Sequence, residues 1–414
     1  MNHYIKNIHI NHLYHLHDFD IPIADENTPH LMLTGKNGSG KTVLLNAIAS
    51  FLDNIKNDKS LGFTKYREHL EYNRNKLSRE MQDAQKLMQT KNNINFYQSQ
   101  IDKVFGQIEL DFVDVANMIE DYQKEDFIIA FYQAARKTQM IEPKNPTKPE
   151  LKGKGDVRST VTNQFLNFLS DLKIQEALAR NEQQFNDAEQ IAQWFASFED
   201  LLRQIYQDNE LKLKFNYKDY SFLICTEGKE FKFTQTSDGF AAILDIVADL
   251  ILKMQTPDNL TRAYQKKGIV LIDEVETHLH LELQKVIMPI LTKVFPNIQF
   301  IITTHSPFVL NSLNNAVAFD LEHREVIDEL TQYSYEALAE GYFGVSSESS
   351  YLEMQLATLG SLLQKKELSD ADKSTIRYLI IDLDKVSESV SPNIVGAYLG
   401  LKNKYAPVIK TVMP

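Results

Sequence analysis

Gly35-Lys36-Asn37-Gly38-Ser39-Gly40-Lys41-Thr42 follows the pattern G-x-x-x-x-G-K-[ST] and comes between a short apolar run and a helix-like segment. The glycines let the backbone curl so that successive N–H groups point at phosphate oxygens, and a helix N-terminus favours the same anion. We expect Lys41 to reach the β- and γ-phosphates and Thr42 to place its hydroxyl on Mg²⁺. Residues 30–34 read as the strand that this motif requires before the loop. The sequence therefore predicts a nucleotide site built on a strand, a loop and a helix.

A second motif is the apolar run Ile269–Ile272, which ends in Asp273 and Glu274. A buried parallel strand brings the residues after it to the carboxyl edge of the sheet, where ligands bind in open α/β folds. We expect Asp273 to hold the Mg²⁺ shell and Glu274 to act as the general base that directs water onto the γ-phosphate. The two motifs lie much farther apart than in small GTPases and most kinases. This spacing indicates a nucleotide domain interrupted by an insertion.

The composition places the chain among globular proteins and excludes several classes. It has 414 residues, 43% hydrophobic residues, a net charge of −12 and one cysteine. A lone cysteine rules out an internal disulfide framework and a multi-cysteine zinc site. The first residues lack the apolar core of a signal peptide, and no apolar run reaches membrane-spanning length. We therefore expect a cytoplasmic protein without a membrane contact.

The rest of the chain alternates between strand-like and helical patterns. Predicted strands cover residues 5–13 and 19–23 of an N-terminal hairpin, 107–112, 127–132, a meander over 212–234, 268–273 and 298–304. Predicted helices cover 66–90, with an end marked by Asn92, Asn93 and Asn95, and then 160–207, 240–254 and 279–294. Lys144–Arg158, which together with the preceding Pro143 holds three prolines and two glycines, reads as a loop or linker.

Charge is spread unevenly along this chain. Arg136–Arg158 has seven basic and three acidic residues, Lys65–Lys103 has eight and five, and Ser306–Pro414 has nine and fifteen. The two basic segments are either solvated faces or contacts for DNA or RNA phosphates. The acidic end is the better candidate for a protein partner.

Two further patterns have a simpler structural explanation. His3, His9, His12, His15 and His17 largely alternate with apolar residues, which favours the polar face of a strand over a metal site. Asp382-Leu383-Asp384 has the D-x-D pattern of Toprim nucleases, but few residues follow it and no alternating strands precede it. A surface helix is the favoured interpretation.

Three stretches carry a resemblance to a known family. Thr236-Ser237-Asp238-Gly239-Phe240 opens a helix and resembles the ABC-type signature LSGGQ, in which Ser237 and Gly239 match and the other three positions depart. Thr303–Pro307, TTHSP, resembles the switch-histidine segment, with His305 at its centre. Asp273–His280, DEVETHLH, looks like the DE-x-E-x-H-L-H stretch of RecF-like and OLD-like ATPases.

The sequence thus resembles the ABC/SMC-like P-loop ATPases, specifically the RecF/OLD-like, AAA15/AAA21-type proteins of bacterial anti-phage defence. The ATPase subunits of the Septu and PARIS systems are the nearest kinds. The resemblance covers residues 1–56 and 205–345, including YEALAEGYFG at 335–344. It implies ATP and Mg²⁺ as cofactors, ATP hydrolysis, and a head-to-head dimer or higher oligomer.

In such a dimer, ATP on the P-loop of one subunit is capped by Ser237 and Gly239 of the other, and His305 contacts the γ-phosphate. The family also implies a glutamine that touches Mg²⁺ and water, for which Gln133 is the candidate and Gln107 the competitor. Adenine contacts are expected from the hairpin, at His12 or Tyr14. The implied partner is a separately encoded nuclease effector of the HNH or Toprim type.

We expect an α/β fold: an ABC-type P-loop ATPase head with a helical insertion and a helical C-terminal region. The head would comprise residues 1–56, 105–135 and 205–345, interrupted by a helical arm at 57–104 and by a basic loop and helical lobe at 136–204, and followed by a helical region at 346–414. The function expected is that of a sensor or scaffold in a defence complex. A RecF-like DNA repair ATPase is the alternative, whereas a transporter head is disfavoured by the departures from LSGGQ.

Overall fold

The computed structural model describes most of the chain, in ranges separated by gaps. The described residues are 5–23, 30–56, 62–77, 84–135, 140–143, 145, 156–255, 264–327, 335, 338, 350–387 and 391–413. The chain divides into two compact units, Met1–Tyr335 and Glu336–Pro414, and each is described by itself.

The centre of the first unit is a six-stranded sheet in the order β12-β11-β3-β10-β9-β5. Its strands are β3 (His30–Thr34), β5 (Phe127–Tyr132), β9 (Lys267–Ile272), β10 (Ile298–Thr303), β11 (Ala316–Asp320) and β12 (Glu325–Ile327). Neighbouring strands of this sheet run parallel, except β12, which pairs antiparallel with β11. The inner strands are continuous apolar runs because both faces of the sheet are covered.

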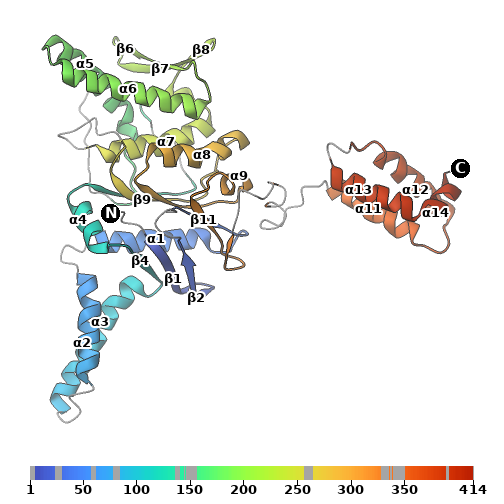
Figure 1. The fold of residues 1–414 in the computed structure, drawn as a ribbon, viewed down its shortest axis with the longest axis horizontal. Helices are drawn as coiled ribbons and strands as arrows, with labels where there is room; N and C mark the ends of the chain where they lie inside the picture. The colour runs from blue at the N-terminus through green and yellow to red at the C-terminus, as the bar shows by residue number, and fades with distance from the viewer. Residues whose placement is uncertain are drawn as a thin grey trace. The chain divides into compact units, whose positions relative to one another are not determined.

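Two layers cover this sheet, as Figure 1 shows. Helix α1 (Lys41–Lys56) lies on one face, together with an antiparallel sheet of β1 (Ile5–Leu13), β2 (Leu16–Pro22) and β4 (Ile108–Phe112). Helices α7 (Asp238–Met254) and α8 (Leu281–Val294) lie on the other face. The fully buried side chain of Gln299 joins the two sheets, since its amide exchanges hydrogen bonds of 2.8 and 3.0 Å with the backbone of Ile5. The predicted α/β class is confirmed.

The helical arm is a hairpin of α2 (Gly62–Leu77) and α3 (Ala84–Phe105). The predicted helix end at Asn92, Asn93 and Asn95 is wrong, because α3 continues through all three residues. Contacts between the helices account for this: Tyr97 of α3 packs on the His69 ring of α2 with centroids 5.2 Å apart. Such tertiary packing outweighs the weak helix propensity of asparagine.

A helical lobe and a small sheet lie beyond α7 and α8 in Figure 1. The lobe consists of α5 (Phe165–Asn181) and α6 (Phe185–Tyr206), and the sheet of β6 (Lys212–Asn216), β7 (Ser221–Thr226) and β8 (Lys229–Lys232). The sequence indicated one helical stretch over 160–207. The structure breaks it after α5, where Gln183 has a φ of 59°. Short helices α4 (Val115–Gln123) and α9 (Pro307–Leu310) complete the described part of this unit.

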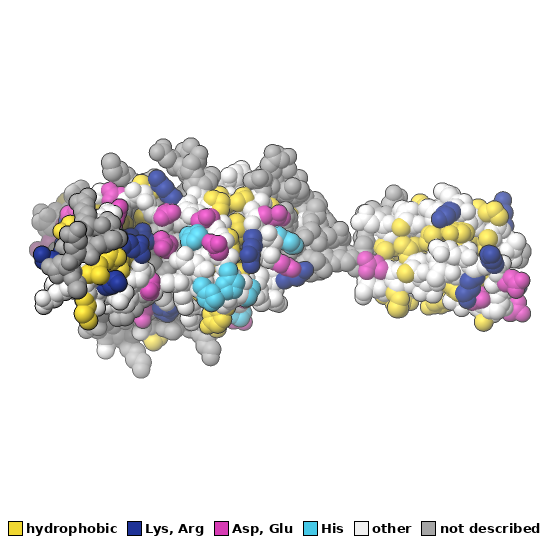
Figure 2. Space-filling model, turned by 90° about the horizontal axis from the view of Figure 1, so that it is seen from below, with side chains coloured by type: hydrophobic (Ala, Val, Ile, Leu, Met, Phe, Trp, Pro, Cys, Tyr) yellow, Lys and Arg dark blue, Asp and Glu magenta, His cyan; other side chains and the backbone are white. Residues whose placement is uncertain are grey.

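The exposed edge of the β1–β2 hairpin carries the histidines noted in the sequence, and Figure 2 shows His side chains gathered on one face. Three of them have partners on the hairpin itself: His9 lies 3.0 Å from Asp20, and the rings of His12 and His17 lie 4.4 Å apart. Among the described residues, no three His, Cys, Asp or Glu side chains are placed to share a metal ion. His3 lies outside the described residues.

The described part of the second unit consists of helices and the short turns between them. Its helices α11 (Ser350–Leu363), α12 (Asp370–Leu383), α13 (Pro392–Lys404) and α14 (Ala406–Val412) surround their own apolar core. Asp382 lies in α12 and Asp384 follows it, and both carboxylates accept hydrogen bonds from neighbouring side chains of this unit. In the described ranges of both units, we find no helix with the length and apolarity needed to cross a membrane.

The buried imidazole of His30 predicts acid sensitivity of the first unit. His30 is 4% exposed, and burial lowers its pKa from 6.5 to about 4. The unfolded chain therefore binds a proton that the folded chain does not, so the free energy of unfolding is largest above pH 6.5 and falls towards pH 4. We expect His30 to account for a loss of about 2 kcal/mol between pH 7 and pH 5.

Urea unfolding at pH 7, 6 and 5 measures this effect. The His30→Gln variant keeps an acceptor for the backbone N–H of Phe300, which lies 3.1 Å from the imidazole Nδ1. Its stability should depend less on pH than that of the wild type. Equal pH dependence in both proteins would contradict the assignment.

Candidate nucleotide-binding site

The loop between β3 and α1 has a backbone that glycine makes possible. Gly35, Gly38 and Gly40 have φ values of 127°, 86° and 101°, in a region that residues with a Cβ rarely adopt. Space is also short at Gly35, where a Cβ would lie 2.9 Å from Ser39 Oγ and 3.2 Å from Asp320 Oδ1. The loop therefore has the curled form expected of a phosphate cradle.

Lys41, the first residue of α1, directs its ammonium back into this loop. Its Nζ donates to the carbonyl oxygens of Gly35 at 2.6 Å and Lys36 at 3.0 Å, and the residue is 6% exposed. Burial lowers the pKa of Lys41, and the nearby carboxylates, with Glu274 first among them, oppose that shift. Both of these partners are uncharged carbonyl oxygens, so the charge of the ammonium is available to an incoming phosphate.

A turn between β11 and β12 supports the loop from outside. Glu322 Oε1 lies 2.9 Å from Lys36 Nζ, and the buried carboxylate of Asp320 orders the turn by accepting from the N–H of Glu322 at 2.7 Å. The Lys36–Glu322 pair is largely exposed, so we expect it to contribute little stability. Sequence reasoning missed this support because no motif marks the turn.

Asp273 joins the three elements that meet at the carboxyl edge of the sheet. Its Oδ1 accepts from Thr42 Oγ1 of α1 at 3.1 Å and from Thr303 Oγ1 of β10 at 2.7 Å, and its own N–H donates to the Tyr132 carbonyl of β5 at 2.8 Å. A hydroxyl and a carboxylate oxygen this close are the hard donors that Mg²⁺ prefers. Thr42 and Asp273 therefore fit the predicted Mg²⁺ site.

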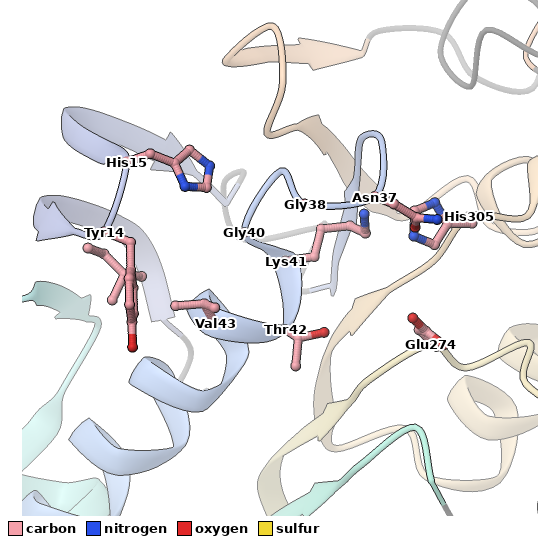
Figure 3. Close-up of a pocket in the computed structure, with 11 residues that line it drawn as sticks. Tyr14, His15, Asn37, Gly38, Gly40, Lys41, Thr42, Val43, Glu274 and His305 are labelled. Carbon is pink, nitrogen blue, oxygen red and sulfur yellow. The ribbon is translucent and has the colours of Figure 1, made fainter.

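Glu274 follows directly and adopts a left-handed backbone, with a φ of 45°. Its N–H donates to Thr303 Oγ1 at 2.7 Å, and its Oε2 accepts from Thr277 Oγ1 at 3.3 Å. A non-glycine residue in this region costs about 1–2 kcal/mol, and such strain concentrates at functional sites. The turn directs the carboxylate into the cavity that faces Lys41 and Thr42 (Figure 3).

His305 lies across the same cavity, after β10. Burial and the Lys41 cation lower the pKa of its imidazole, so the neutral form is favoured at pH 7. Its backbone N–H donates to Glu276 Oε1 at 2.5 Å. Burial raises the pKa of Glu276, which sequence reasoning did not single out although the DE-x-E spacing contains it. Glu276 thus ties the Asp273–Glu274 turn to the histidine segment.

The cavity has a volume of about 340 Å³ and extends from the phosphate loop to the tip of the β1–β2 hairpin. At the hairpin end, Tyr14 lies beside Val43 in Figure 3 and is 74% exposed. His15 Nε2 lies 3.2 Å from the carbonyl oxygen of Ser39 and so holds the hairpin against the loop. Of the two residues considered for adenine contacts, Tyr14 lines this cavity and His12 does not.

Three predicted site residues lie apart from the cavity of their own chain. Ser237 is exposed at the start of α7, and its hydroxyl does not cap that helix. Gly239 is buried, and a Cβ there would lie 2.9 Å from the carbonyl oxygen of His278, in the turn after Glu274. Gln133 is exposed and follows Tyr132 at the end of β5, next to Asp273. Gln107, the other candidate for the glutamine that touches Mg²⁺ and water, lies at the edge of the antiparallel sheet.

A protein-family model matches the part of the chain that contains this site. The family model AAA_21, "AAA domain, putative AbiEii toxin, Type IV TA system", matches residues 31–311, from β3 to the end of α9. This chain belongs to the AAA_21 family. The matched range contains the phosphate loop, Ser237, Asp273, Glu274 and His305.

The relatives of this AAA_21 chain include defence proteins. Septu protein PtuA of Bacillus mycoides is 27% identical over 311 residues, which are 74% of this chain and 38% of PtuA. The Retron Ec83 probable ATPase of Escherichia coli is 43% identical over 82 residues, or 20% of this chain and 15% of that protein. The chain therefore spans much less than two thirds of these relatives.

Among solved structures, the SmcHead bound to the C-winged helix domain of ScpA is similar to this chain, with 11% sequence identity and a TM-score of 0.35. The aligned residues cover 76% of this chain and 93% of the SmcHead chain. The family match and the Septu relative confirm the resemblance inferred from the sequence motifs.

Proposed function

We propose that this chain binds ATP with Mg²⁺ in the cavity between the phosphate loop and Glu274, and hydrolyses it to ADP and phosphate. The observation that carries the proposal is the 3.1 Å hydrogen bond between Thr42 Oγ1 and Asp273 Oδ1, beside Glu274 and His305. These groups come from α1, from the turn after β9 and from the end of β10. Their convergence provides a phosphate cradle, a metal site and a base in one cavity.

Each residue has a distinct chemical task in this proposal. The loop N–H groups and Lys41 bind phosphate oxygens, and Thr42 and Asp273, assisted by Gln133, hold Mg²⁺, which supplies charge neutralisation on the phosphates. Glu274 accepts a proton from the attacking water. Neutral His305 orients groups at the γ-phosphate by hydrogen bonding, because the lowered pKa keeps a lone pair on the ring.

We propose a head-to-head dimer in which Ser237 and Gly239 of one copy complete the site of the other. Support comes from their placement: Ser237 is exposed at a helix N-terminus and does not line its own chain's cavity. A helix N-terminus with a free hydroxyl suits a phosphate delivered by a second copy. Tyr14 beside Val43 provides an apolar platform on which the adenine can stack.

We further propose that the chain is the sensor or scaffold of an anti-phage complex and controls a separate nuclease effector. The relatives that support this role are a Septu protein and a protein of a retron system. None of the reported relatives is a DNA repair protein, so the RecF-like alternative is not favoured. The basic segment Arg136–Arg158 lies largely outside the described residues, as does most of Tyr335–Gly344.

Co-purification tests the effector role. The chain is expressed with the products of its adjacent open reading frames, with an affinity tag on this chain alone. We expect a nuclease encoded next to it to co-elute at a fixed ratio, and to be absent from the eluate when this chain is omitted. A wild-type chain that hydrolyses ATP but retains none of these products would contradict the effector role and leave the ATPase proposal standing.

A further inference from the structure

Helix α7 carries a carboxylate in an otherwise apolar interior. Asp249 is fully buried, and the buried residues of α7 other than Asp249 and Asp245 are glycine, alanine and larger apolar side chains. Three donors surround its carboxylate: Tyr132 Oη at 2.7 Å, the backbone N–H of Val161 at 2.6 Å and Lys253 Nζ at 2.6 Å. These three donors come from three different segments of the chain.

A buried, hydrogen-bonded ion pair is a poor source of stability. Removing two charges from water costs several kcal/mol per ion, and well-packed apolar replacements are often as stable or more so. What such a cluster provides is a fixed relative position of the elements that it joins, because an altered register would leave a buried charge unpaired. The role of Asp249 therefore depends on which elements it joins.

Tyr132 connects Asp249 to the catalytic edge of the sheet. It is the last residue of β5, and while its hydroxyl is held by α7, its carbonyl oxygen accepts the N–H of Asp273 at 2.8 Å. The next residue is Gln133, the candidate for contacts to Mg²⁺ and water. Tyr132 thus links α7 to Asp273 and Gln133, the two residues of the proposed Mg²⁺ site that lie beside it.

The segment Asp156–Thr162 connects the same cluster to the phosphate-loop helix. Besides the Val161–Asp249 bond, Lys253 Nζ donates to the Ser159 carbonyl at 2.7 Å. Arg158 Nη2 reaches Ser50 Oγ of α1 at 3.3 Å, and the Val157 carbonyl accepts the N–H of Phe131 at 2.8 Å. Asp249 therefore lies where α7, β5 and this segment meet.

The start of α7 is also fixed against the catalytic turn. Gly239 packs so closely on the His278 carbonyl that a Cβ would lie 2.9 Å from that oxygen. Helix α7, which Ser237 precedes, is thus held at its N-terminus by the turn after Glu274 and farther along by the end of β5. A displacement of α7 would move both Gln133 and the proposed lid, that is, Ser237 and Gly239, which cap the nucleotide of the second copy.

We propose that Asp249 and Tyr132 are positioning residues for ATP hydrolysis, which set α7 and the end of β5 in the register that the reaction needs. The inference rests on the proposed function and adds two residues that touch neither nucleotide nor metal. Their hydrogen bond transmits the position of the lid helix to Asp273 and Gln133.

Tyr132→Phe removes the hydroxyl and keeps the ring. We expect its kcat for ATP hydrolysis to fall about tenfold while KM changes less than about twofold, because misplaced catalytic groups impair the reaction more than binding. Asp249→Asn should lower kcat similarly. Since both changes remove the Tyr132–Asp249 bond, the loss in the double variant should be smaller than the product of the two single losses.

The second unit offers a matched control. Tyr398 Oη donates to Asp384 Oδ1 at 2.8 Å, and Lys402 Nζ lies 2.9 Å from the same oxygen, so the same three residue types meet there. Tyr398→Phe should leave kcat and KM unchanged. If Tyr132→Phe keeps kcat within twofold of the wild type, or lowers it only as much as Tyr398→Phe does, the inference is wrong.

Hydrogen–deuterium exchange of the full chain gives a readout that needs no turnover. Tyr132→Phe should speed exchange in peptides that contain Asp273, residues 133–135 and the start of α7, and Tyr398→Phe should not. Unchanged exchange there overturns the positioning role even if kcat falls. A wild type that hydrolyses no ATP refutes the proposed function, and the exchange result then decides whether Tyr132 holds these elements in place.

Discussion

Glu274→Gln is expected to bind ATP and to stop hydrolysing it. The amide keeps the size of the side chain but cannot accept the proton of the attacking water, so kcat should fall at least about a hundredfold. Lys41 and the loop N–H groups are untouched, and the affinity for ATP should stay within a few-fold of the wild type. Because turnover no longer ends the ATP-bound state, the proposed dimer should accumulate with ATP in size-exclusion chromatography with light scattering.

Glu282→Gln provides the matched control for this substitution. Glu282 lies in the first turn of α8, and its side chain is 73% exposed and paired with Lys285 at 3.1 Å. The same chemical change there should leave phosphate release and the monomer–dimer distribution as in the wild type. If Glu274→Gln releases phosphate at the normal rate, Glu274 is not the base and the assignment of the catalytic turn fails.

Lys41→Ala is expected to abolish nucleotide binding. It removes the cation that the loop holds at its centre, where Nζ lies 2.6 Å from the Gly35 carbonyl. Loss of a charge-assisted contact to phosphate, together with loosening of the loop, should weaken ATP binding at least about a hundredfold. Isothermal titration calorimetry with ATP and Mg²⁺ measures this, and retained affinity would contradict the phosphate assignment.

Lys41→Met separates charge from folding, since it keeps the buried stem of the side chain. We expect it to lose ATP binding like Lys41→Ala while the melting temperature stays close to that of the wild type. The opposite outcome is a large fall in melting temperature in both variants, together with ATP binding that returns under conditions that stabilise the fold. That outcome would show that Lys41 is needed for folding and not for phosphate binding.

Mixing two inactive variants tests the shared site. Ser237→Arg is the suitable lid variant because Ser237 is exposed, whereas any side chain at Gly239 would collide with the His278 carbonyl. A mixed dimer of Lys41→Ala and Ser237→Arg contains one site with both an intact loop and an intact lid. We expect the mixture to regain ATP hydrolysis that neither variant shows alone. No recovery, with mixed dimers present, would contradict the head-to-head arrangement.

The elements that the sequence predicted best are those with a local signal. The strand over 127–132, the βαβ unit that contains Asp273 and the glycine loop all depend on apolar periodicity or on backbone freedom within a few residues. The helix end at Asn92–Asn95 was predicted wrongly because the packing of Tyr97 against α2 is not visible in local composition. Local propensity is a weak guide where distant side chains supply the contacts.

The sequence alone determined the chemistry that we propose for this site. Phosphate binding needs glycines, a lysine and a hydroxyl at fixed spacing, and this pattern is visible in eight consecutive residues. The strand that ends in Asp273 and Glu274 can likewise be recognised from its own residues. The tertiary structure decided which distant groups hold the site residues in place. Glu276 accepts a hydrogen bond from the backbone N–H of His305, and the Thr303 hydroxyl bonds both Asp273 and Glu274. Tyr132 bonds Asp249 through its hydroxyl and Asp273 through its carbonyl oxygen. The physical reason is that hydrogen bonds at the sheet edge join residues as many as 231 positions apart (Thr42 and Asp273), and their geometry exists only once the strands have paired.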